Sequence, residues 1–100
     1  MMFRARRTSV SAQREVRIRN KLGLHARPAA QFVKSARGFR SEIWLVKDGT
    51  RYSAASLIDV LRANLDCGAK ATLEAHGPDA EEALERLEKL LAELHKIEEA

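Results

Sequence analysis

Two kinds of apolar spacing alternate along this chain and restrict it to a mixed α and β fold. Apolar side chains recur every three or four positions, the spacing of an amphipathic helix, in residues 26–37, 56–64 and 79–96. Alternating apolar residues, or β-branched and aromatic ones, indicate strands at residues 15–19, 41–46, 50–52 and 70–76. Their order predicts an α+β fold (βαββαβα), with three helices on one face of a four-stranded, mostly antiparallel sheet.

Length and composition narrow the class of protein further. A chain of 100 residues is the size of one domain, and its longest apolar run, residues 43–46, is far shorter than the ~20 residues of a membrane-spanning helix. Cys67 is the only cysteine, which excludes an internal disulfide and a cysteine-rich zinc site. Together with the lack of a signal-peptide pattern, these features predict a cytoplasmic protein without direct membrane insertion.

The net charge of +4 belongs to the N-terminal segment. Arg4, Arg6, Arg7 and Arg14 precede the first acidic residue, Glu15, and the rest of the chain carries 14 basic and 14 acidic residues. We expect a basic, disordered tail at residues 1–14, a domain at 15–96 and a short C-terminal tail at 97–100. The tail also has the Arg-rich, acid-free character of a transit peptide, or it reflects an upstream start codon. A neutral domain argues against a nucleic-acid partner.

The start of the helix at 26–37 breaks the usual rules for helix ends. A helix N-terminus exposes unpaired N–H groups and a partial positive charge, which acidic or hydroxyl side chains normally offset. Here His25 occupies the cap position and Arg27 the first turn, and no acidic residue lies between Asn20 and Ser41. This pattern predicts a site for an anion supplied from outside, such as a phosphoryl group. The alternative is that His25 is only an adequate cap beside a surface arginine.

The chemistry of these residues suits phosphoryl transfer. The positive end of a helix favours the neutral, nucleophilic form of an imidazole. A phosphoryl group on His25 would bring close to two negative charges. The backbone N–H groups of Ala26 and Arg27 and the Arg27 guanidinium are placed to stabilise them.

At this point the sequence resembles the phosphocarrier protein HPr family of the bacterial sugar phosphotransferase system. Residues 22–30, LGLHARPAA, resemble the active-site signature of that family, and the similarity continues through 31–34, 38–39, 41–43, 48–49 and 56–57 and into the last helix. The resemblance covers about residues 15–94. It implies an open-faced β-sandwich that acts as a carrier rather than a stand-alone enzyme, without a cofactor. By that resemblance, enzyme I, charged from phosphoenolpyruvate, phosphorylates His25, Arg27 steadies the group, and a IIA domain of a sugar permease receives it.

The resemblance also assigns roles near the helix at 56–64. Ser56 corresponds to the serine that HPr kinase/phosphorylase modifies in some bacteria, although Ala55 stands where the family often has Lys. An ordinary N-cap, with Asp59 three residues on as in a capping box, explains Ser56 equally well. Leu57, Ile58 and Leu61 would form an apolar docking patch, or some of them belong to the core.

Besides the carrier role, two other functions remain possible at this point, and several residues are assigned no function. The chain is either a phosphoryl carrier or a regulatory phosphoprotein that acts mainly by binding partners according to the state of Ser56; a nucleic-acid-binding domain is the third possibility. We expect a monomer. His76 and His95 lack partners at metal spacing and are predicted to be surface residues, while Trp44 and Cys67 are predicted to serve in packing.

Overall fold

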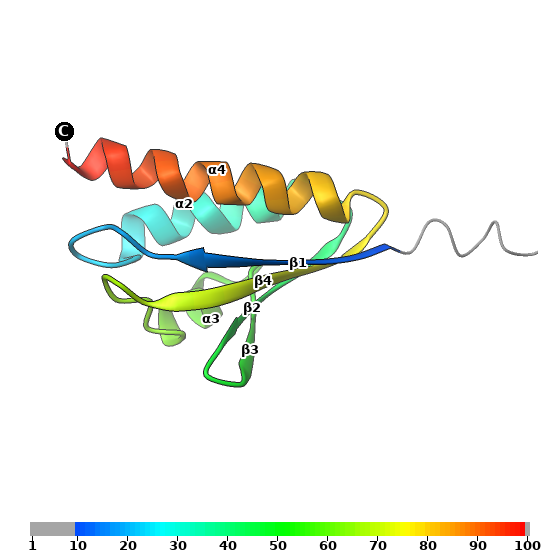
Figure 1. The fold of residues 1–100 in the computed structure, drawn as a ribbon, viewed down its shortest axis with the longest axis horizontal. Helices are drawn as coiled ribbons and strands as arrows, with labels where there is room; N and C mark the ends of the chain where they lie inside the picture. Colours follow the sequence, from blue (N-terminus) through cyan, green and yellow to red (C-terminus); the bar gives the residue numbers. More distant parts are fainter. Residues whose placement is uncertain (1–9, 100) are drawn as a thin grey trace, which may run out of the picture.

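The structure, a computed structural model, describes residues 10–99, and side chains between residues 11 and 95. It contains one antiparallel sheet of four strands in the order β1-β4-β2-β3, and α2 and α4 lie across one face of it (Figure 1). This confirms the predicted α+β class and element order. The elements are β1 (Val10–Arg17), α2 (Ala26–Ala36), β2 (Glu42–Lys47), β3 (Thr50–Ser53), α3 (Leu57–Arg62), β4 (Lys70–Gly77) and α4 (Ala80–Glu99).

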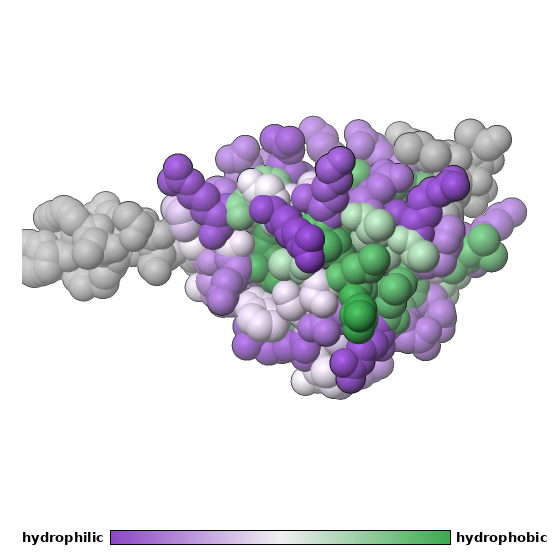
Figure 2. Space-filling model, turned by 180° about the vertical axis from the view of Figure 1, so that it is seen from behind, coloured by the Kyte–Doolittle hydropathy of each residue, from purple (hydrophilic) through white to green (hydrophobic). Residues whose placement is uncertain are grey.

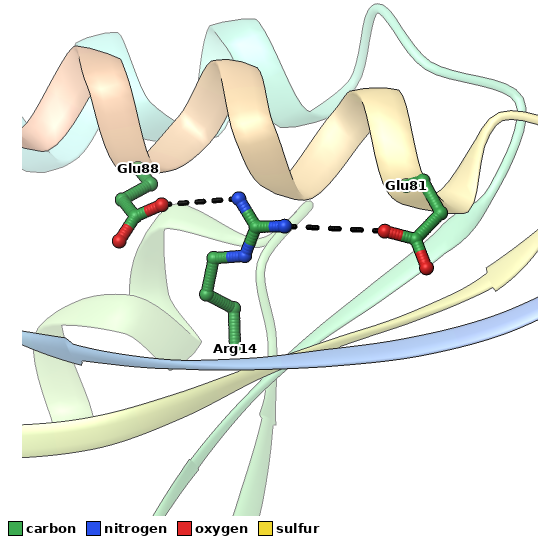
Figure 3. Close-up of polar contacts among 3 residues, drawn as sticks. All are labelled: Arg14, Glu81 and Glu88. Carbon is green, nitrogen blue, oxygen red and sulfur yellow. Dashed lines mark hydrogen bonds and ion pairs between the residues drawn. The ribbon is translucent and has the colours of Figure 1, made fainter.

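Strand β1 corrects the predicted boundary of the N-terminal tail. It begins at Val10, so residues 10–14, which were assigned to the disordered tail, pair with β4 as far as Gly77. Arg14 also donates a hydrogen bond to Glu88 at 3.1 Å and lies 3.9 Å from Glu81, both on α4 (Figure 3). The segment continues the alternation of the rest of β1, with Ala12 buried between exposed Ser11 and Gln13, and is held by pairing with β4 and by the contacts of Arg14 with α4. The tail prediction for residues 1–9 lies outside the described residues.

The C-terminal boundary also moves. Helix α4 continues to Glu99, so residues 97–99, predicted to be a tail, are helical. No glycine or proline follows residue 78 to end a helix, and Ile97, Glu98 and Glu99 do not interrupt one.

The core lies between the sheet and its helices. β4 alternates buried and more exposed side chains, and Leu45 and Leu73 from the central strands meet Phe32 of α2 and Leu84 and Leu87 of α4. Each of these five side chains is at most 1% exposed, and burial of one such side chain contributes roughly 1.5–3 kcal/mol. Trp44 is half-buried, with the Arg51 guanidinium 4.3 Å from its ring centre.

The ends of α3 and α4 are fixed by side chains from elsewhere in the fold. Lys47, at the end of β2, donates from Nζ to the carbonyls of Ala63 at 3.0 Å and Asn64 at 2.6 Å. Asn64, just after α3, has φ 54°, a left-handed conformation that asparagine tolerates at a helix end. Asp79, before α4, accepts hydrogen bonds from Ser41 and from the Arg40 N–H, which hold the pKa of its carboxyl below the ordinary value. Between residues 10 and 99, no helix has the length and apolar content needed to cross a membrane.

Candidate functional site

At the N-terminus of α2, no capping or acidic side chain of the first turn offsets the unpaired N–H groups and the positive end of the helix, as the sequence predicts. His25 is the N-cap residue, with φ −78° and ψ −171°, and its side chain makes no capping hydrogen bond. The first turn contains no acidic residue, and the first intrahelical bond runs from the Ala29 N–H to the His25 carbonyl at 2.9 Å. The N–H groups of Ala26 and Arg27 therefore have no acceptor within the helix, while Pro28 has no N–H to satisfy.

These residues also have the exposure that a surface site needs. Ala26 and Arg27 are exposed and His25 is half-buried, whereas Pro28 and Ala29 are buried and anchor the turn to the core. The structure thus brings together the three predicted site residues, His25, Ala26 and Arg27, on one helix turn. An anion at this turn would meet backbone N–H groups, the positive end of the helix and a guanidinium.

A close contact between two loops positions His25. The Leu24 N–H donates to the Leu65 carbonyl at 2.8 Å, and the Leu24 side chain is buried. Gly23 has φ +71°, and a Cβ added there would lie 2.6 Å from the Leu65 carbonyl oxygen and 2.9 Å from the Asp66 Cα. Only glycine allows this approach, so the segment after α3 determines where α2 begins.

Ser56 occupies the N-cap of α3, as the sequence predicts. Its hydroxyl oxygen accepts a hydrogen bond from the Asp59 N–H at 3.2 Å. The Asp59 carboxylate, however, accepts from the Ser53 N–H at 3.2 Å and not from that of Ser56, so the reciprocal half of a capping box is not formed. Arg37, the C-cap residue of α2, donates from Nε to the carbonyl of Ala55, the residue before Ser56, at 2.8 Å.

The predicted docking residues divide into exposed and packed ones. Ile58 is 67% exposed and Leu61 is 41% exposed, whereas Leu57 is half-buried against the core. A third large apolar side chain, that of Leu22, is 76% exposed, and sequence reasoning missed it. We call Leu22, Ile58 and Leu61 the apolar patch. Hydrophobic side chains gather on the face seen in Figure 2, and Leu22 lies next to the loop contact that joins residue 23 to the segment after α3.

The remaining singled-out side chains lie apart from this helix turn. His76 is exposed, with Nδ1 2.9 Å from the Ser11 hydroxyl, and Cys67 is exposed rather than packed, so its predicted packing role is wrong. His95 is half-buried, so it is partly exposed at the surface as predicted, with its Nδ1 enclosed. Among the described side chains, no group of three or more His, Cys, Asp or Glu residues could hold a metal ion.

The fold and the site together define an open-faced α+β sandwich that carries a histidine at the start of an uncompensated helix. The family model for the PTS HPr component phosphorylation site matches residues 12–93, and the chain belongs to this HPr family of the phosphotransferase system.

Curated relatives and a solved structure agree with this assignment. The chain is 44% identical over 75 residues to the HPr-like protein Crh of Bacillus subtilis, covering 75% of this chain and 88% of Crh. It is 42% identical over 83 residues to the phosphocarrier protein HPr of Vibrio cholerae, covering 83% of this chain and 98% of the relative. The crystal structure of an HPr from Bacillus anthracis is similar with a TM-score of 0.77 and 38% identity, covering 81% of this chain and 96% of that one.

Proposed function

We propose that this chain is a phosphoryl carrier that uses His25. An imidazole nitrogen of His25 accepts the phosphoryl group from phosphoenolpyruvate-charged enzyme I and later gives it to a IIA domain of a sugar permease. The observation that supports this most is the uncompensated start of α2, where His25 makes no capping bond and the first turn holds Arg27 but no acidic residue.

Local electrostatics give the phosphorylated state its stability. The phosphoryl group on His25 carries close to two negative charges at neutral pH. It lies within the positive end of α2, where the N–H groups of Ala26 and Arg27 have no acceptor in the helix. The exposed Arg27 guanidinium adds a charge-assisted hydrogen bond. The group is therefore held long enough to travel between partners, yet stays accessible for transfer.

The apolar patch provides the contact with both partners. Ile58 and Leu61 are exposed on α3, and α3 packs against α2, so the patch and the histidine belong to neighbouring elements. A small apolar surface suits a transient interface, because each partner must release the carrier after transfer. The carrier acts as a monomer in the cytoplasm in this scheme.

Phosphorylation with radiolabelled phosphoenolpyruvate and a general enzyme I tests the carrier role. We expect an acid-labile label on the wild-type chain, its transfer to a IIA domain, and no label on His25→Ala. The matched control is His76→Ala, which removes an exposed histidine elsewhere and should be labelled normally. A label that persists in His25→Ala, or no label on the wild type, would contradict the proposal.

A regulatory role for Ser56 is the second candidate, favoured by the position of Arg37. Phosphate on the Ser56 hydroxyl would stand beside a guanidinium that is already held on the Ala55 carbonyl. The similarity to Crh, described as the catabolite repression HPr of Bacillus subtilis, also favours a regulatory role. With HPr kinase/phosphorylase and ATP, we expect an acid-stable label that Ser56→Ala abolishes and His25→Ala retains. No label on the wild type would remove this role and leave the carrier function untouched.

A further inference from the structure

A groove separate from the α2 start lies along the outer side of β1. Its volume is about 560 Å³, and it is lined by β1 and the residues that follow it, by Lys70 at the start of β4, and by one side of α4 from Glu88 to His95. Because β1 is an edge strand in the order β1-β4-β2-β3, none of the described strands pairs with its outer edge. α4 runs along β1 (Figure 1), and residues of both elements line the groove.

The groove has buried apolar lining residues and a second set of lining residues that is mainly cationic, which we call its rim. Val16, Ile18 and Leu91 are all less than 9% exposed, so they form a firm apolar surface. The lining also contains three cationic residues, Arg17, Arg19 and Lys70, against two acidic ones, Glu15 and Glu88.

The acidic part of the lining is already partly neutralised. Arg14 donates to the Glu88 carboxylate at 3.1 Å (Figure 3). The lining therefore contains more positive than negative charge. This bias belongs to the groove, because the residues from 15 to 100 taken together are neutral.

His95 adds a polar group with no hydrogen-bond partner among the described side chains. It lines the groove, yet its Nδ1 is enclosed and unbonded within the part of the chain that the structure describes. A buried nitrogen left in this state is unfavourable. A ligand that accepts a hydrogen bond from Nδ1–H would relieve the unfavourable state.

We infer that this groove binds an amphipathic organic anion. The apolar body of the ligand lies on Val16, Ile18 and Leu91, and its carboxylate or sulfonate meets the cationic rim and the Nδ1–H of His95. The site shares no residue with the proposed phosphoryl site, so its occupancy is independent of His25.

Two probes test this chemistry on the full chain in phosphate-free buffer. The first is 8-anilinonaphthalene-1-sulfonate, which reports binding by fluorescence, and the second is octanoate, added as a competitor. We expect saturable fluorescence that octanoate displaces. In the double variant Arg19→Glu, Lys70→Glu, the affinity for both probes should fall roughly fivefold or more.

Matched variants distinguish binding in the groove from binding elsewhere on the chain. Lys21→Glu, Lys34→Glu makes the same change in net charge on exposed residues outside the groove and should bind as the wild type does. Ile58→Ser removes part of the apolar patch and should also leave the affinity unchanged. Loss of binding in Ile58→Ser alone, equal loss in both charge variants, or no binding by the wild type would each overturn the inference.

His95→Leu tests the role of the imidazole without relying on a loss of folding. Leucine fills the space and removes the unpaired nitrogen, so the melting temperature should stay the same or rise while octanoate binding weakens roughly threefold. In the wild type, octanoate should shift the ¹⁵N resonance of His95 Nδ1. An unchanged affinity in His95→Leu together with an unchanged resonance would exclude His95 from the site.

Discussion

The starts of α2 and α3 are built in opposite ways. At α3, Ser56 accepts a hydrogen bond from the Asp59 N–H, Asp59 supplies an acidic group in the first turn, and Arg62 supplies a cation in the last. At α2, His25 makes no capping bond and the first turn holds a cation. A compensated helix start is explained by stability alone. An uncompensated one, held in place by the Gly23 contact, points to an anion from outside the chain.

Giving α2 the kind of start that α3 has should produce the largest effect. His25→Asp supplies a carboxylate that caps the helix, so the free energy of unfolding should rise by about 1 kcal/mol. Phosphoryl acceptance from enzyme I should fall by more than about 10³-fold, because the nucleophile is gone. Urea unfolding and label incorporation measure the two changes, and a destabilised His25→Asp would show that α2 is compensated in some other way.

Loosening the support of α2 should have the next largest effect. Gly23→Ala introduces a Cβ 2.6 Å from the Leu65 oxygen at φ +71°, and should cost on the order of 3 kcal/mol and slow transfer. Gly49→Ala is the matched control, because Gly49 has φ +81° but nothing within 4 Å of its added Cβ. Chemical denaturation of the two variants separates the clash from the backbone conformation, and equal losses would argue against a loop-contact role for Gly23.

Removing the cation at the α2 start should affect transfer more than stability. We expect Arg27→Ala to slow phosphoryl transfer roughly 10- to 100-fold, as loss of one charge-assisted donor does, with the melting temperature unchanged or slightly higher. Lys34→Ala, in the last turn of the same helix, should do the reverse, with a small loss of stability and normal transfer. Rapid-quench kinetics and thermal melts report both, and a large fall in melting temperature for Arg27→Ala would contradict this assignment.

Removing the cap of α3 should affect stability alone. Ser56→Ala deprives the Asp59 N–H of its acceptor and should lower the free energy of unfolding by about 1 kcal/mol, with phosphoryl transfer to His25 unchanged. Ser56→Thr keeps the hydroxyl and should retain most of the stability. If Ser56→Ala is fully folded and still accepts the phosphoryl group more slowly, the starts of α2 and α3 are coupled.

The smallest expected effect is on the pH dependence of stability, through Asp79 at the start of α4. Hydrogen bonds from Ser41 and Arg40 lower the pKa of Asp79 in the folded state below 3.8. Its contribution to stability is therefore full above the unfolded pKa and is lost as pH falls through the lower folded value. Asp79→Asn should be less stable than the wild type at pH 7, and this difference should shrink below about pH 4. A difference that stays constant from pH 7 to pH 2 would contradict the assignment.

Patterns within single segments of the sequence predict the order of the elements and the character of the helix starts. The periodicities predict the element order, Ser56 predicts a capped helix, and the run around His25 predicts an uncompensated start; the structure confirms all three. These features depend on residues within one helical turn of each other, so their physical causes are contained in a short stretch of sequence.

Tertiary structure alone decided the features that depend on distant residues. Residues 10–14 form a strand because they pair with β4 and because Arg14 contacts α4. Leu57 is packed and Ile58 is exposed because of how α3 lies on its neighbours. The exposure of Leu22, the half-burial of His95 and the groove beside β1 likewise arise between elements. Burial is set by which surfaces meet across the fold, and apolar spacing within one segment does not contain that information.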